Sequence, residues 1–310
     1  GSPWGAALLR QAKLELASAQ GLSWCELLWD INKFYDAVNL EVVAEVGWKQ
    51  DYPLINLFVG LQLAAGPRRV KTDTCVSDII VPGRSLSAGC WQAVDFSRLA
   101  LWEVLEHLHF RYRPLDLSSW VDDLGATAIG PERVVISRAV EVSRSLVQGL
   151  LRLGFQMSSK SSIVSSVTKI SDTVVQQLRK AGVELIVSRH VRDLGVDGHA
   201  TRRSTATMQK RLKKASTKAK YFQAVIKVDR EARQLASSGY RPTIWGVEAM
   251  GLAPTTLRRL RGQVAPMSSC RYTGACSTTA IRLGFSDEAD PQVSARSQRC
   301  REWCSRLYTL

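Results

Sequence analysis

The stretch "LLWDINKFYDAV" (Leu27–Val38) joins an apolar run to two aspartates, Asp30 and Asp36. The apolar residues before Asp30 predict a short buried strand over 24–31. A carboxylate at the end of a buried strand is costly unless a cation meets it. The sequence therefore raises the question of which cation Asp30 meets.

A second stretch, "LDLSSWVDDLGATAIG" (115–130), predicts two strands joined by a tight turn at Asp122–Asp123. If this hairpin neighbours the first strand, three carboxylates converge, and they would repel one another without a cation. Two Mg²⁺ ions, or Mn²⁺ in their place, would resolve that repulsion. Each motif alone has a plainer interpretation, because aspartates are common in turns and as helix caps. Together, at strand ends about 90 residues apart, they are more specific.

The rest of the pattern predicts an α+β fold with an antiparallel sheet and packed helices, followed by an all-helical basic region. Helices are expected at 5–21, 39–50, 52–66, 85–110, 131–154 and 171–182, and further strands at 74–83, 158–167 and 183–198. We expect a core over 1–198, a helical part over 199–265, and a C-terminal extension over 266–310 without clear periodicity.

Charge is unevenly distributed along a chain whose formal net charge is +14. Residues 24–130 hold 9 Lys and Arg against 14 Asp and Glu, whereas residues 199–264 hold 15 against 3. Such a basic segment favours a polyanionic partner, most often nucleic acid. The plainer alternative is a soluble protein with one solvated basic face.

The 7 cysteines are odd in number and scattered, which favours a reducing compartment over secretion. The sequence shows no signal-peptide pattern and no apolar run of the ~18 residues that a membrane span needs. We therefore expect an intracellular protein without a membrane partner, and a nuclear one if the source is eukaryotic. The C-terminal cysteines do not have the spacing of a zinc ribbon.

"DINKFYD" and "WVDD" together resemble the first and third palm motifs of reverse transcriptases, especially those of non-LTR retroelements and group II introns. The resemblance spans Leu27–Gly198 and, more weakly, the helical region to Val264. It implies a polymerase palm followed by a thumb, an RNA template, a DNA primer and deoxynucleoside triphosphates (dNTPs). It also implies two-metal nucleotidyl transfer to the primer 3′-hydroxyl. Asp30, Ile31 and Asp122 would bind the metals, and Asp123 would assist or orient.

The same resemblance assigns nucleotide contacts to Ile31, Tyr35 and Gly89. Tyr35 matches the steric gate that excludes a 2′-hydroxyl, although a core aromatic is an equal alternative. In "SLSAGCWQA" Gly89 would let the backbone approach the nucleotide, but the usual preceding glutamine is Ala88. In "GFQMSSKSS" Lys160 would approach the leaving pyrophosphate, unless it is an ordinary surface lysine.

Nucleic-acid contacts are implied farther along the chain. "RDLGV" resembles the primer-grip hairpin through Leu194 and Gly195. The thumb-like segment would contact phosphates without reading sequence. These contacts would come from Lys210, Arg211, Lys213, Lys214, Lys218 and Lys220.

Two departures from the family pattern leave other functions open. Trp120 stands where a tyrosine is usual, and only 29 residues precede Asp30, whereas the family has a longer fingers region. We therefore expect a fragment or a decayed element, and a non-catalytic nucleic-acid-binding remnant is the main alternative. A nucleotide cyclase would share the carboxylates but would not need the basic tail.

Overall fold

The computed structural model describes residues 3–87, 89–113, 115–188, 190–193, 196–199, 206–229, 239–247, 251–268, 274 and 276–307. By its internal contacts the chain divides into two compact units. We call Ala17–Arg189 the sheet unit, and Gly1–Leu16 with His190–Leu310 the helical unit. Helix α1 (Pro3–Ala19) begins in the helical unit and ends in the sheet unit.

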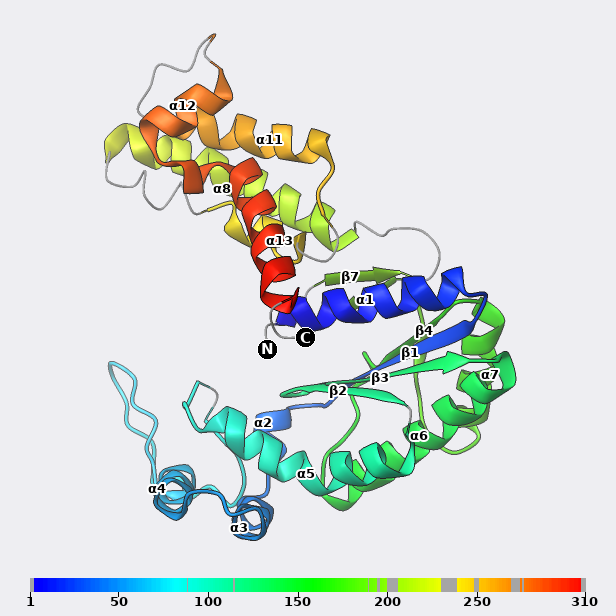
Figure 1. The fold of residues 1–310 in the computed structure, drawn as a ribbon. Coiled ribbons are helices and arrows are strands. Elements are labelled where there is room, and N and C mark those ends of the chain that lie inside the picture. The colour runs from blue at the N-terminus through cyan, green and yellow to red at the C-terminus, as the bar shows by residue number, and fades with distance from the viewer. Residues whose placement is uncertain are drawn as a thin grey trace. The chain divides into compact units, whose positions relative to one another are not determined.

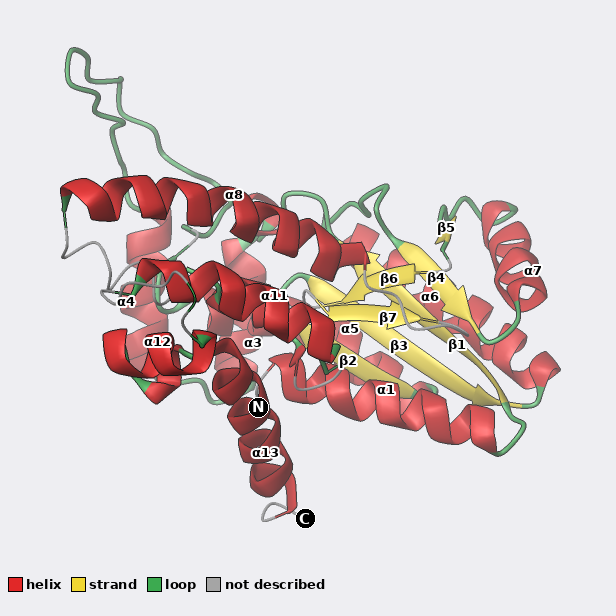
Figure 2. Cartoon of the chain, turned by 90° about the horizontal axis from the view of Figure 1, so that it is seen from above, coloured by secondary structure: helices red, strands yellow, loops and turns green. Residues whose placement is uncertain are grey.

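A five-stranded sheet with the order β2-β3-β1-β4-β5 forms the centre of the sheet unit (Figure 2). The strands are β1 (Ser23–Asp30), β2 (Asp116–Trp120), β3 (Asp123–Gly130), β4 (Ser162–Ser165) and β5 (Ile186–Val187). β1 pairs antiparallel with both β3 and β4, and only the β4–β5 pair is parallel. Because β1 is central, its consecutive residues from Trp24 to Leu27 are all buried.

Helices cover one face of this sheet and supply most of the remaining core (Figure 1). The helices of the sheet unit after α1 are α2 (Phe34–Ala37), α3 (Leu40–Lys49), α4 (Leu54–Ala65), α5 (Ala93–Arg111), α6 (Glu132–Arg152) and α7 (Thr168–Arg179), and α3 packs on α5 and α4 rather than on the sheet (Figure 1). α6 contacts β1 and β3, and α7 contacts β4. The buried residues of α6 recur every three or four positions, as an amphipathic helix requires. They include Val135, Ala139, Val142, Leu146 and Leu150.

The helical unit packs a second core of its own. Its elements are β6 (His190–Asp193), β7 (Val196–His199), α8 (Ala206–Val228), η2 (Arg241–Ile244), α11 (Pro254–Val264), η3 (Ala265–Met267), α12 (Ser277–Gly284), η4 (Asp287–Ala289) and α13 (Pro291–Leu307). The C-terminal stretch, which shows no clear periodicity in the sequence, thus forms two helices. In the described parts of the chain, no helix is long and apolar enough to cross a membrane.

The predicted α+β class is confirmed, while three local predictions are corrected. The segment predicted as a strand over 74–83 forms only isolated bridges, Arg68↔Ile80 and Lys71↔Val76, because its apolar side chains are exposed and have no sheet to join. The helix predicted from residue 85 starts at Ala93, after a turn at Gly89. The turn predicted at Asp122–Asp123 lies one residue earlier, at Val121–Asp122.

Candidate nucleotidyl-transfer site

Three aspartates, Asp30, Asp122 and Asp123, lie at one end of the central strand pair. Asp30, the last residue of β1, is the register partner of Asp123, the first residue of β3. Directly opposed residues of antiparallel strands have Cα atoms about 4.5–5.5 Å apart, with their side chains on the same face. Asp122 precedes Asp123 in the two-residue turn between β2 and β3. The predicted neighbourhood of the two motifs is therefore present.

The turn that carries Asp122 is strained. Trp120 pairs with Asp123, which leaves Val121 and Asp122 as the two turn residues. Val121 has φ 60°, a left-handed conformation that is an outlier for a β-branched side chain. Such a conformation costs about 1–3 kcal/mol and persists only when the surrounding structure fixes it. The strained residue directly precedes Asp122 in the chain.

The electrostatic surroundings of the carboxylates suit a cation. Asp30 and Asp122 are half-buried, and Asp123 is exposed. Neither Asp30 nor Asp122 forms an ion pair with any residue that the structure describes. Burial, and to a lesser extent the charge of Asp122, raises the pKa of Tyr35. The Tyr35 phenol therefore lies within electrostatic reach of Asp122.

The described residues do not form a complete metal site by themselves. Across the described residues, no group of three or more His, Cys, Asp and Glu side chains is arranged to hold a metal ion alone. Mg²⁺ commonly takes only one or two carboxylates and fills its remaining positions with water and substrate phosphates. Asp30 and Asp122 fit that pattern, so the predicted Mg²⁺ remains a prediction that the residues can accommodate.

The two aromatic residues after Asp30, Phe34 and Tyr35, differ in how deeply they are buried. Phe34 is buried and stacks on Phe155, with ring centroids 5.2 Å apart. Tyr35 is only half-buried at the edge of the same core. Phe34 thus fills the core position, and the Tyr35 ring packs against it at the core edge, with ring centroids 5.7 Å apart.

Hydrogen bonds hold the predicted Lys160 loop against the strand that ends at Asp30. The Ser158 amide donates to the Asp30 carbonyl at 2.8 Å, and the Asp30 amide donates to Ser161 Oγ at 3.1 Å. Lys160 lies between these two serines and is exposed. The side chain of Ile31 is buried, at 3% exposure, so any contact of Ile31 with a metal or nucleotide would use its backbone.

A backbone hydrogen bond connects the segment before the Gly89 turn to Tyr35. The Leu86 amide donates to the Tyr35 carbonyl at 2.8 Å, and the Cys90 amide donates to the Ser87 carbonyl across the turn at 3.0 Å. Gly89 has φ 90°, which favours glycine, and no atom lies within 4 Å of where its Cβ would be. Gly89 is exposed and follows the segment that is bonded to Tyr35 through Leu86. Ala88 lies outside the described residues.

One polar residue near this turn escapes sequence analysis. Gln92 is 1% exposed and donates through Nε2 to the Asn56 carbonyl at 2.7 Å, which ties α5 to α4. Its Oε1 has no hydrogen-bond partner within the described part of the chain. A single glutamine at the start of a helix carries no sequence signal for this role.

The predicted nucleic-acid contacts of the helical unit lie on α8. Its buried residues Leu212, Ala215 and Ala219 face the core. The exposed residues include the predicted Lys210, Lys213, Lys214, Lys218 and Lys220. Arg211 is half-buried, and its Nη1 donates to the Trp245 carbonyl at 3.0 Å, so it also has a structural role. Leu194 and Gly195 lie outside the described residues.

Comparison with known proteins gives structural similarity only. No family model and no curated protein matches the chain. Telomerase from Candida tropicalis, in complex with the TWJ fragment of telomeric RNA, is similar with a TM-score of 0.47 and 12% identity, over 94% of this chain and 47% of that chain. Apo telomerase from the same organism gives 0.46 and 12%, over 93% and 50%. This chain spans about half the length of those chains.

Proposed function

We propose that this chain carries the palm and thumb of a reverse transcriptase, an RNA-directed DNA polymerase. The observation that supports the proposal most is the register that opposes Asp30 and Asp123, with Asp122 in the adjoining turn. The sequences of the two aspartate motifs favour the non-LTR retroelement or group II intron type among these polymerases. The substrates would be an RNA template, a DNA primer and dNTPs.

Each residue of the site has a distinct task in this reaction. Asp30 and Asp122 would bind the metal ions, and Asp123 would orient the neighbouring carboxylate. When bound, two Mg²⁺ ions supply the charge that activates the primer 3′-hydroxyl and stabilises the leaving pyrophosphate. Lys160 would donate a proton to that pyrophosphate.

The nucleotide would be selected by the residues around Tyr35. The half-buried ring of Tyr35 would lie under the sugar and exclude a 2′-hydroxyl. The Gly89 turn, which is hydrogen-bonded to the Tyr35 segment through Leu86, would let the backbone approach the nucleotide. The exposed lysines of α8 would contact duplex phosphates, which makes binding dependent on salt and independent of sequence.

Primer extension on an RNA template, with Mg²⁺ or Mn²⁺, tests the proposal. We expect the wild type to incorporate dNTPs and Asp122→Asn to lose about 10³-fold or more of that rate. Asp172→Asn is a matched control, because it removes an exposed carboxylate from α7 in the same unit. The control should retain the wild-type rate.

Duplex affinity separates the proposal from its alternative. Asp122→Asn should bind primer–template duplex as tightly as the wild type, since the lysines of α8 are unchanged. Duplex binding by the wild type without incorporation, in either metal, would instead identify a non-catalytic nucleic-acid-binding protein. Equal incorporation by Asp122→Asn and the wild type would refute the assigned site.

A further inference from the structure

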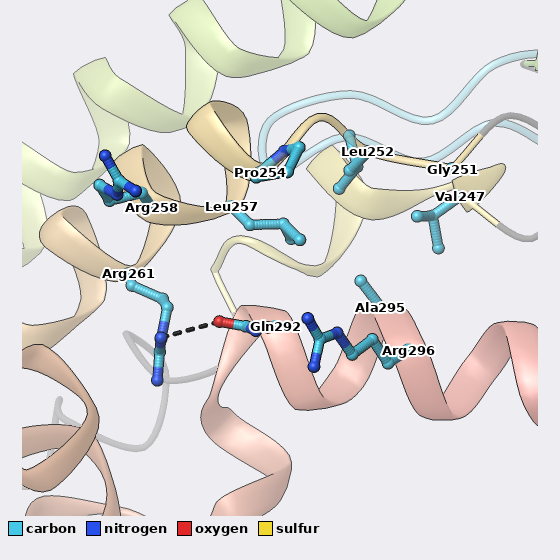
Figure 3. Close-up of a pocket in the computed structure, with 10 residues that line it drawn as sticks. All are labelled: Val247, Gly251, Leu252, Pro254, Leu257, Arg258, Arg261, Gln292, Ala295 and Arg296. Atoms are coloured by element: carbon cyan, nitrogen blue, oxygen red, sulfur yellow. Dashed lines mark hydrogen bonds between the residues drawn. The ribbon is translucent and has the colours of Figure 1, made fainter.

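A cavity of about 400 Å³ lies in the helical unit between α11 and α13 (Figure 3). Its volume falls within the usual range of small-molecule sites. Apolar side chains line much of it, including Val247, Leu252, Leu257 and Ala295. The cavity belongs entirely to the helical unit, whereas the three carboxylates belong to the sheet unit.

One wall of the cavity is fixed by a buried ion pair. Arg261 Nη2 lies 2.8 Å from Asp290 Oδ2, and Arg261 Nη1 donates to Gln292 Oε1 at 2.8 Å. Asp290 is fully buried and also accepts the Gln292 amide at 2.8 Å, which caps the start of α13. Because Asp290 neutralises Arg261, this pair builds the wall and adds no net charge to the cavity.

Two further arginines give the cavity its charge. Arg258 of α11 and Arg296 of α13 line it from the two helices and are exposed (Figure 3). Neither forms an ion pair with another residue in the described ranges. No Asp or Glu is among the described lining residues. The cavity therefore presents two uncompensated guanidinium groups beside an apolar surface.

Arg261 also leaves a hydrogen-bond donor unused. Its Nε is buried and has no acceptor among the residues that the structure describes. A buried donor without a partner is destabilising. Because this nitrogen is shielded from solvent, the positive charge that a ligand can reach comes from Arg258 and Arg296.

We propose that this cavity binds a single nucleotide of a single-stranded nucleic acid. A guanidinium group binds phosphate through paired hydrogen bonds and also stacks on aromatic rings. A nucleotide combines a phosphate, which Arg258 and Arg296 can bind, with a planar base that a guanidinium group can stack on and the apolar side chains can cover. The choice of nucleic acid as ligand rests on the proposed function, but binding here needs neither metal nor polymerase turnover.

Calorimetric titration with adenosine 5′-monophosphate, without divalent metal, tests the site directly. We expect saturable 1:1 binding, with adenosine and inorganic phosphate each at least about 10-fold weaker, because each lacks one half of the recognised group. Phosphate binding as tight as the nucleotide would mean that the base is not recognised. That result, or no binding of the nucleotide, would overturn the proposal.

Matched variants separate the cavity from general positive charge. Arg258→Gln with Arg296→Gln should weaken nucleotide binding about 10-fold or more. Arg259→Gln with Arg301→Gln removes two exposed arginines that lie on the same helices but outside the cavity lining. This pair should keep the affinity for the nucleotide within about 2-fold of the wild-type value. Equal losses in the two pairs would overturn the proposal.

A third variant fills the cavity without changing its charge. Ala295 is buried on the apolar side, so Ala295→Leu should abolish nucleotide binding while thermal unfolding reports whether the helices remain folded. Anisotropy of a labelled 10-nucleotide RNA should show a loss in the same variants. Primer extension on a long duplex measures the sheet-unit carboxylates separately, so failure of one proposal is distinguishable from failure of the other.

Discussion

The two units differ in whether an aspartate that is shielded from solvent has a cationic partner. In the helical unit Asp290 is fully buried and paired with Arg261 at 2.8 Å. In the sheet unit Asp30 and Asp122 are half-buried and have no cationic partner in the described structure. Asp290 is therefore compensated within the protein, whereas Asp30 and Asp122 are the carboxylates that the proposed metal ions would meet.

The balance of acidic and basic residues also differs between the two units. The sheet-unit stretch 24–130 is net acidic, with 14 acidic against 9 basic residues, and the stretch 199–264 is strongly basic, with 15 against 3. One unit concentrates carboxylates at a strand end, while the other exposes lysines along a helix whose opposite face is buried. The proposed function requires this difference, because it assigns metal and nucleotide to the first region and a phosphate backbone to the second.

Cysteine reactivity should give the largest difference between the units. Hydrogen bonds from the Thr279 and Thr278 amides lower the pKa of Cys276 in the helical unit to about 7, whereas burial raises that of Cys25 in β1 to about 12. Because the thiolate is the nucleophile, iodoacetamide at pH 7.5 should alkylate Cys276 at least ~10³-fold faster. The Cys276 rate should fall as pH drops below 7, as its thiolate is protonated.

Peptide mass spectrometry measures both cysteine rates in one sample. In urea the two rates should converge, since unfolding removes both environments. Rapid alkylation of Cys25 in the native protein would contradict the buried placement of β1.

Breaking the ion pair of the helical unit should have the next largest effect. Arg261→Met leaves Asp290 as an uncompensated buried charge, so we expect a loss of about 3–5 kcal/mol in the free energy of unfolding. Arg282→Met is the control, because its ion pair with Asp287 is exposed and contributes less than about 1 kcal/mol. Urea denaturation of both variants checks the difference, and equal stability of the two would argue against a structural role for Asp290.

Tyr35 tests whether the site beside Asp122 selects the sugar. Tyr35→Ala should increase ribonucleotide incorporation relative to deoxynucleotide incorporation by about 10–100-fold, because the ring no longer excludes the 2′-hydroxyl. Tyr52→Ala is the control, since Tyr52 packs edge-on against Phe96 in the same unit. Competition between labelled nucleotides in primer extension gives the ratio, and an unchanged ratio would return Tyr35 to a packing role.

Removing a carboxylate from the sheet unit should have the smallest effect on stability. Asp30→Asn relieves repulsion from the neighbouring carboxylates, so without metal the free energy of unfolding should change by less than about 1 kcal/mol, in the stabilising direction. Asp290→Asn provides the contrast, because it leaves Arg261 without its partner. Chemical denaturation in EDTA measures both, and a large loss in Asp30→Asn would mean that Asp30 is paired within the fold.

The sequence predicts the parts of the site that depend on local pattern. The apolar run before Asp30 and the hairpin around Asp122 each have a short-range signal, and their pairing follows from placing both in one sheet. The turn lies one residue earlier than the sequence predicts, because Val121 adopts a conformation that its residue type disfavours.

Contacts between residues far apart in the sequence cannot be predicted from local pattern. The pairing of Arg261 with Asp290 and the hydrogen bond from Gln92 to Asn56 join residues far apart in sequence and leave no periodic trace. The predicted strand over 74–83 had the right composition but no sheet edge to pair with, because strand propensity depends on neighbours. The cavity between α11 and α13 likewise arises from packing in a segment without clear periodicity.

Anomalous diffraction from crystals grown with Mn²⁺, primer–template duplex and a non-hydrolysable dNTP would test the shared metal site most directly. We predict two Mn²⁺ peaks about 3.5–4 Å apart, both within ligand distance of Asp30 and Asp122 carboxylate oxygens. Peaks bound elsewhere, or Asp30 and Asp122 each paired with a cation of the protein while the nucleotide is bound, would contradict the assignment.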